Sequence, residues 1–180
     1  MSPVFLQAVE QLKEWIAAGS VDLTRQQVRK GVMHSSTETL RFRVKSLSEA
    51  ELQDINQLCP EPLPPAYFHF LREVGCGEFF IDELRAAFDI FGLDELHQAA
   101  SHIAQEIAEE DEPTVDSFFM IGVHNSMGDW MGFCTSRKEA DNYEVFNHEV
   151  PIYCYAEDAF WKNFEDWVIA AVKSKGQETL

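Results

Sequence analysis

Residue types that occur in hydrolase active sites lie close together in one stretch of the chain. Residues 121–133 read IGVHNSMGDWMGF and place His124, Asn125, Ser126 and Asp129 between apolar flanks. Serine, histidine and aspartate can form a triad in which the histidine takes the proton of the serine hydroxyl. The members of a triad, however, come from separate elements and meet only in the fold. The stretch also lacks the G-x-S-x-G motif of a nucleophile elbow.

A turn between two strands explains the same residues better than catalysis does. Gly128 permits a positive φ, and the side chains of Asn125 and Asp129 can bond to the neighbouring backbone. A single histidine in such a turn offers too few ligands for a metal ion. We therefore favour a turn over a catalytic or metal site.

The rest of the sequence contains no second constellation that indicates catalysis. Cys59, Cys76, Cys134 and Cys154 are dispersed without a C-x-x-C pair, which favours a role as core residues. His102 and Glu106 are four residues apart and fit either a weak metal site or, more often, a solvated ion pair. The sequence predicts no enzyme activity, no metal and no cofactor.

Charge is distributed unevenly along the 180 residues, a length suited to one domain. Residues 1–60 carry seven acidic and seven basic side chains, so the whole net charge of −17 lies in residues 61–180. Such a surface repels nucleic acid and anionic membranes, and it attracts basic proteins. The acidity indicates either a basic protein partner or a role in solubility alone. The densest run of negative charge is Glu109, Glu110, Asp111 and Glu112.

No apolar run reaches the length of a membrane span, and the first residues, MSPVFLQAVEQLKEW, lack the basic start and apolar stretch of a signal peptide. We therefore expect a cytoplasmic protein.

Periodicity and capping signals predict an α+β fold, with a single domain and a mainly antiparallel sheet flanked by helices. We expect helices over residues 3–18, 48–58, 65–74, 94–109 and 158–171, with a short, weakly periodic helix in 21–33. We expect strands over residues 39–45, 78–81, 87–91, 117–123, 130–135, 143–146 and 151–155. A regular βαβ alternation is missing, which makes a doubly wound fold less suitable.

Three segments together resemble the SUKH superfamily, in particular its Smi/Knr-type group. They are LPPAYFHFLREVGCGEF (63–79), FFMIGVHNSMGDWMGF (118–133) and AFWKNFEDWV (159–168). The resemblance covers residues 47–172 and implies a SUKH-like α+β domain there. Residues 1–46 form an N-terminal helical extension with one strand, expected to pack on the core, and residues 173–180 form a C-terminal tail.

The resemblance implies a protein-binding domain without a catalytic site. Bacterial members are commonly immunity proteins that neutralise toxins, and fungal relatives regulate cell-wall synthesis and signalling. We expect a protein partner, either a basic, nuclease-like toxin domain or an endogenous cell-wall or signalling protein. The predicted contact residues are Glu109, Glu110, Asp111, Glu112, Asp129 and Trp130; packing in the core is the alternative for Trp130. The oligomeric state stays open.

Overall fold

The computed structural model describes residues 1–29, 31–59, 62–109, 118–125, 129–134, 144–146 and 161–177. The first half contains α1 (Pro3–Ala18), β1 (Ser20–Arg29), β2 (Val32–Lys45), α2 (Glu49–Leu58), α3 (Pro65–Glu73), β3 (Cys76–Ile81) and β4 (Phe88–Ile90). The second half contains α4 (Leu93–Glu109), β5 (Phe118–His124), β6 (Asp129–Cys134), β7 (Glu144–Phe146), β8 (Trp161–Asn163) and α6 (Phe164–Ser174). This arrangement confirms the predicted single-domain α+β fold.

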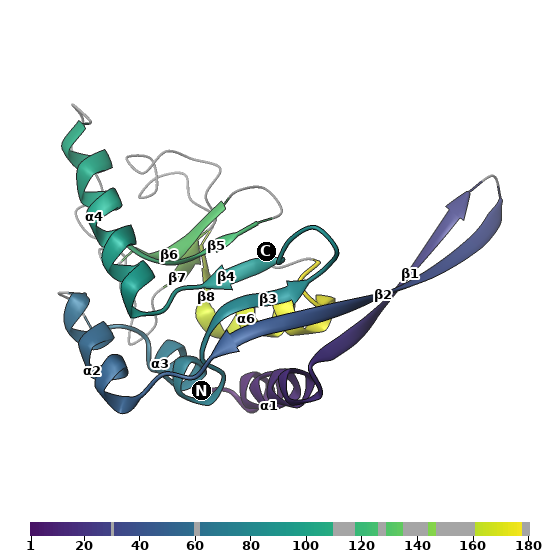
Figure 1. Cartoon of the computed structure of the whole chain (residues 1–180), viewed down its shortest axis with the longest axis horizontal. Helices are drawn as coiled ribbons and strands as arrows, with labels where there is room; N and C mark the ends of the chain where they lie inside the picture. Colours follow the sequence, from purple (N-terminus) through teal and green to yellow (C-terminus); the bar gives the residue numbers. More distant parts are fainter. Residues whose placement is uncertain are drawn as a thin grey trace.

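The strands form one sheet whose spatial order, β1 to β8, is also their order in the sequence. Every described neighbouring pair is antiparallel. Figure 1 shows the hairpin of β1 and β2 extending from one end of the molecule, with α2 and α4 at the opposite end. The two ends of the chain meet through the helices, since α1 packs against α6.

Side chains at the helix ends explain where several helices begin and stop. The Ser2 hydroxyl accepts a hydrogen bond from the Phe5 amide at 3.2 Å, and α1 ends at Gly19 with φ +81°. Ser48 and Glu51 form a capping box at the start of α2. These starts and the end at Gly19 confirm the sequence prediction.

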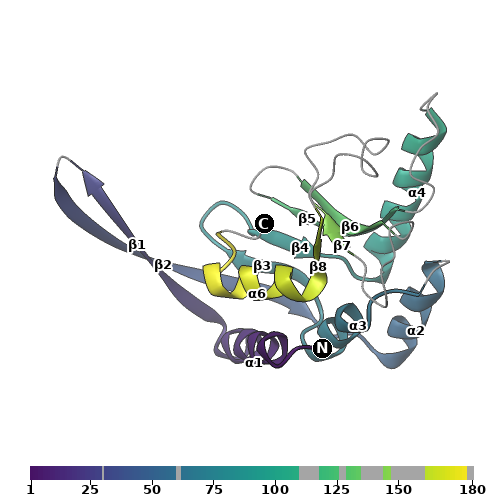
Figure 2. The same ribbon diagram turned by 180° about the vertical axis from the view of Figure 1, so that it is seen from behind.

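The core lies between one face of the sheet and the helices α1, α3 and α6, which gather on that face in Figure 2. Tyr67 of α3 has its ring centroid 5.4 Å from that of Phe133 and 5.5 Å from that of Phe164. Trp167 of α6 packs edge-on against Phe88 of β4 at 5.0 Å. Aromatic contact of this kind, added to the burial of apolar area, fixes the helices on the sheet.

The prediction of a helix within residues 21–33 is wrong. Residues 20–29 form β1, which pairs with β2 from Ser20 opposite Arg41 to Arg29 opposite Val32. Gly31 has φ +76° in the connection between the strands. Glycine adopts this conformation readily, so it serves here as a turn residue.

The last helix also begins later than the expected start at residue 158. Residues 161–163 form β8, in which Trp161 pairs with Phe146, whereas residues 158–160 lie outside the described part of the chain. The Asn163 side chain accepts a hydrogen bond from the Asp166 amide at 2.8 Å and so caps α6. Strand pairing with β7 here overrides the aromatic helical pattern. The strand expected over 151–155 lies outside the described residues.

Within the described ranges, the structure contains no helix long and apolar enough to cross a membrane.

Candidate protein-binding surface

The predicted contact residues lie at two places. Glu109 is the last residue of α4, and Glu110, Asp111 and Glu112 lie outside the described residues. Asp129 and Trp130 begin β6, where their backbones pair with those of His124 and Val123. The structure therefore does not bring the six residues together into one described surface, and their role in binding stays a prediction.

The stretch that contains the triad-type residues forms a hairpin of β5 and β6, as expected for strands joined by a turn. His124 is the last residue of β5 and is only 7% exposed. Burial lowers the pKa of His124, and the nearby Arg85 guanidinium adds to this effect. The imidazole is therefore neutral at pH 7. Ser126 and Gly128 lie outside the described residues.

A row of paired residues, polar in β2 to β4 and apolar in β5, crosses the sheet on the face opposite α1, α3 and α6. Arg43 pairs with Glu78, Glu78 with Asp89, and Asp89 with Val123, so these four residues form one row across β2 to β5. We call them the cross-strand row. Arg43 and Glu78 also form an ion pair. Burial raises the pKa of the Asp89 carboxyl, which a hydrogen bond with Asn125 partly opposes.

A pocket of about 280 Å³ opens beside this row, where β2, β3 and the start of α4 meet α2. Its lining includes Lys45 of β2, Glu51 of α2 and Cys76 of β3, together with Asp94 and Glu95 from the first turn of α4. Arg43 also lines the pocket, so its lining contains three carboxylates and two basic groups. The lining is therefore slightly acidic.

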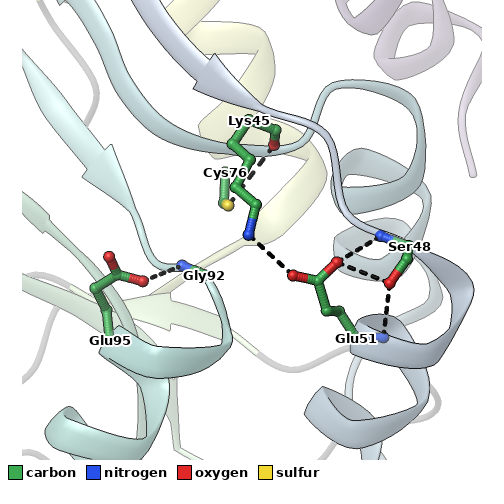
Figure 3. A network of polar contacts seen from close by, with 6 residues as sticks. All are labelled: Lys45, Ser48, Glu51, Cys76, Gly92 and Glu95. Atoms are coloured by element: carbon green, nitrogen blue, oxygen red, sulfur yellow. Dashed lines mark hydrogen bonds and ion pairs between the residues drawn. The ribbon is translucent and has the colours of Figure 1, made fainter.

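Glu51 connects the pocket to the start of α2, as Figure 3 shows. One of its oxygens accepts hydrogen bonds from the amide and the hydroxyl of Ser48, each at 2.8 Å, and the other lies 3.0 Å from the Lys45 ammonium. The Ser48 amide, the Lys45 ammonium and the Ser48 hydroxyl together lower the pKa of Glu51 to about 2. Glu51 is therefore a fixed negative charge at the rim.

Cys76 lies at the base of the pocket but is not activated as a nucleophile. Its side chain is 5% exposed, and the thiol donates a weak hydrogen bond to the Lys45 carbonyl at 3.7 Å. Burial, followed by the Glu95 carboxylate, raises the pKa of the thiol. Because the thiolate is the reactive form, Cys76 is kept in its inert form at neutral pH.

The pocket could not be predicted from the sequence. Its residues come from β2, α2, β3 and α4, and the sequence separates Lys45 from Glu95 by fifty positions. The Ser48–Glu51 spacing of a capping box and the alternating basic residues of 41–45 are separate local features of the sequence. Only the pairing of β2 with β3 and the return of α4 to α2 places them together.

Comparison with known proteins identifies the family. The sequence profile of the SMI1 / KNR4 family (SUKH-1) matches residues 46–170, which is more than half of the chain. The chain belongs to the SMI1/KNR4 family. The recognised SUKH resemblance is thereby confirmed.

One curated relative carries a functional name. Immunity protein RhsIB of Dickeya dadantii (strain 3937) is 24% identical to the chain over 136 residues, covering 76% of this chain and 80% of the relative. No solved structure gives a significant match.

Proposed function

We propose that this SMI1/KNR4 protein is an immunity protein that neutralises a bacterial toxin by forming a stoichiometric complex with it, without catalysis. The observation that carries the proposal is the similarity to immunity protein RhsIB over 136 residues. We place the complex in the cytoplasm and assign toxin binding to the SUKH unit, residues 47–172.

Charge supports a basic toxin domain, such as a nuclease, as the partner. The net charge of −17 lies entirely in residues 61–180, and the lining of the pocket beside the cross-strand row has one more carboxylate than basic groups. An acidic inhibitor is steered towards a basic partner and can occupy the groove that would bind nucleic acid phosphates. The association rate is expected to fall steeply as the salt concentration rises.

Toxicity of the neighbouring gene product tests the proposal directly. The gene upstream of this one is expressed in cells with and without the protein. The proposal predicts that the product kills cells only when the protein is absent, and that the two copurify in a fixed ratio. A harmless neighbour that does not bind would refute the immunity role and favour a regulatory scaffold for an endogenous partner.

A charge-matched pair of variants tests the predicted contact residues. The triple variant Glu110→Gln, Asp111→Asn and Glu112→Gln neutralises most of the acidic run. The control, Glu14→Gln, Asp54→Asn and Glu83→Gln, neutralises the same residue types at exposed positions on α1, α2 and the β3–β4 connection. Both variants change the net charge from −17 to −14, since each removes three negative charges.

Loss of net charge alone would slow association by the same factor in the two variants. We expect a further loss of affinity, of roughly tenfold or more, in the acidic-run variant only, because truncated contacts raise the dissociation rate. Equal affinities for the two variants would remove the acidic run from the contact surface. Trp130→Ala and Asp129→Asn are measured alongside to test the second predicted contact.

A further inference from the structure

The part of the β1–β2 hairpin farthest from the core is exposed on both faces. We call residues 24–37 the arm; in Figures 1 and 2 it extends away from the helices and from the rest of the sheet. Every arm residue whose side chain is described is exposed, including Val28 at 69%, Val32 at 57% and Met33 at 67%. The arm therefore gains no stability from apolar burial. Its contacts with the rest of the chain lie at its base, where Arg25 donates a hydrogen bond to Gln177 and forms an ion pair with Glu38.

Two strands without further packing are only marginally stable in water. The register places Val28 opposite Met33 near the tip, and Thr24 opposite Thr37 at the base. β3 begins to pair with β2 only at Arg41, so the described pairing leaves both edges of the arm without a neighbouring strand. Exposed strand edges are templates for association. A docking partner would stabilise the arm.

The charge of the arm is opposite to that of the remaining chain. Residues 24–37 contain Arg25, Arg29 and Lys30 and no aspartate or glutamate, so their net charge is +3. The chain carries −17, which leaves −20 on the other residues. An arm of this sign fits an acidic protein surface, and the body of a second copy is such a surface, present at the same concentration as the arm.

We propose that the protein forms a twofold symmetric dimer in which the basic arm of each copy lies on the acidic body of the other. Because the dimer is symmetric, each copy contributes its arm and its receiving surface to the same interface. A stable interface needs roughly 20–30 residues from each partner. One 14-residue arm is too small, whereas an arm plus a receiving surface of similar size on each copy reaches that range.

The mass of the full chain in solution tests the dimer. Light scattering during size-exclusion chromatography, at high micromolar concentration and about 0.1 M salt, is expected to give twice the chain mass of 20.6 kDa. At about 1 M salt, where the Debye length falls to about 3 Å, the mass is expected to shift towards one chain. A single-chain mass under both conditions would overturn the proposal, as would a dimer indifferent to salt.

Two variants with opposite charges at the same two arm positions distinguish an effect of charge on dimerisation from an effect on folding. Gln26 and Ser36 are exposed and lie on opposite faces of the arm. The variant Gln26→Glu/Ser36→Glu lowers the arm charge from +3 to +1, and Gln26→Lys/Ser36→Lys raises it to +5. The dimer dissociation constant is expected to rise about tenfold or more in the first and to fall in the second. Equal changes in both variants would overturn the proposal.

Removal of the arm gives a second test. In a shortened chain, Asn-Gly replaces residues 24–37 and joins Leu23 to Glu38, which are already opposite each other in the register. This variant is expected to be monomeric and to unfold at the same temperature as the single-chain form of the parent at high salt. A shortened chain that still dimerises would overturn the proposal. None of these measurements depends on toxin binding.

Discussion

The hydroxyl of Tyr67 provides a test of how the core is stabilised. Tyr67 lies on α3 and is 0% exposed, among the rings of Phe68, Phe133 and Phe164. Its hydroxyl has no hydrogen-bond partner within the part of the chain that the structure describes. Burial raises the pKa of this hydroxyl, so it is protonated at every pH at which the protein is studied. We predict that Tyr67→Phe stabilises the protein.

The size of the effect follows from the cost of desolvation. A buried polar group without a hydrogen bond costs about 1–3 kcal/mol, and removal of the oxygen abolishes that cost. The removed atom leaves a small gap, whose lost dispersion contacts oppose part of the gain. We expect the free energy of unfolding to rise by about 1 kcal/mol. For a chain of this size, that corresponds to a rise of about 2–4 °C in the melting temperature.

Urea unfolding of the wild type and the variant, followed by tryptophan fluorescence and far-ultraviolet circular dichroism, measures the change. Phe70→Tyr is the reverse control, because Phe70 is 1% exposed and its ring centroid lies 5.7 Å from that of Phe164. This control adds a buried hydroxyl and is expected to destabilise the protein by about 1–3 kcal/mol or more. A loss of 1 kcal/mol or more in Tyr67→Phe would show that the hydroxyl is bonded and would refute the reasoning.

Further predictions concern the backbone and the pocket rim. Gly77 has φ +128°, and an added Cβ would lie 2.2 Å from the Arg43 carbonyl oxygen, so Gly77→Ala is expected to cost more than about 3 kcal/mol in chemical unfolding. Gly19→Ala at φ +81°, with no atom within 4 Å, is the control and should cost only about 1–2 kcal/mol. The folded-state pKa of Glu51, about 2, lies below its ordinary value of 4.5, so its carboxylate stabilises the fold above pH 4.5 and this contribution disappears as the pH falls towards 2. Thermal unfolding across that range should therefore show Glu51→Gln less stable than wild type at neutral pH and equal to it near pH 2; a constant difference would contradict this.

Helix caps could be predicted from the sequence because they depend on residues a few positions apart. The Ser2 cap and the Ser48–Glu51 box each involve a side chain and an amide within three residues. The strands β5 and β6 were predictable for the same reason, since apolar residues flank a short polar stretch, and their antiparallel pairing is described. Local chemistry was sufficient for these features.

Features that depend on distant pairing were not predictable. Residues 24–37 are exposed on both faces, so their sequence lacks the apolar alternation that marks a strand, and β1 was interpreted as a helix. Trp161 continues a helical aromatic pattern but pairs with Phe146 instead. The acidic pocket was missed because four elements supply its lining. The predicted role of the acidic run in binding stays a prediction, since three of its residues lie outside the described part of the chain.

The packing of α1 against α6 has a consequence for synthesis of the protein. Phe5, Val9 and Leu12 of α1 belong to the same buried cluster as Trp167 and Val168 of α6. The ribosome makes α1 first and α6 more than 140 residues later. Until α6 emerges, the apolar side of α1 lacks one of its covers, and the nascent chain presents it to chaperones or to other nascent chains. Translation that stalls before α6 would therefore release an aggregation-prone fragment that contains most of the strands.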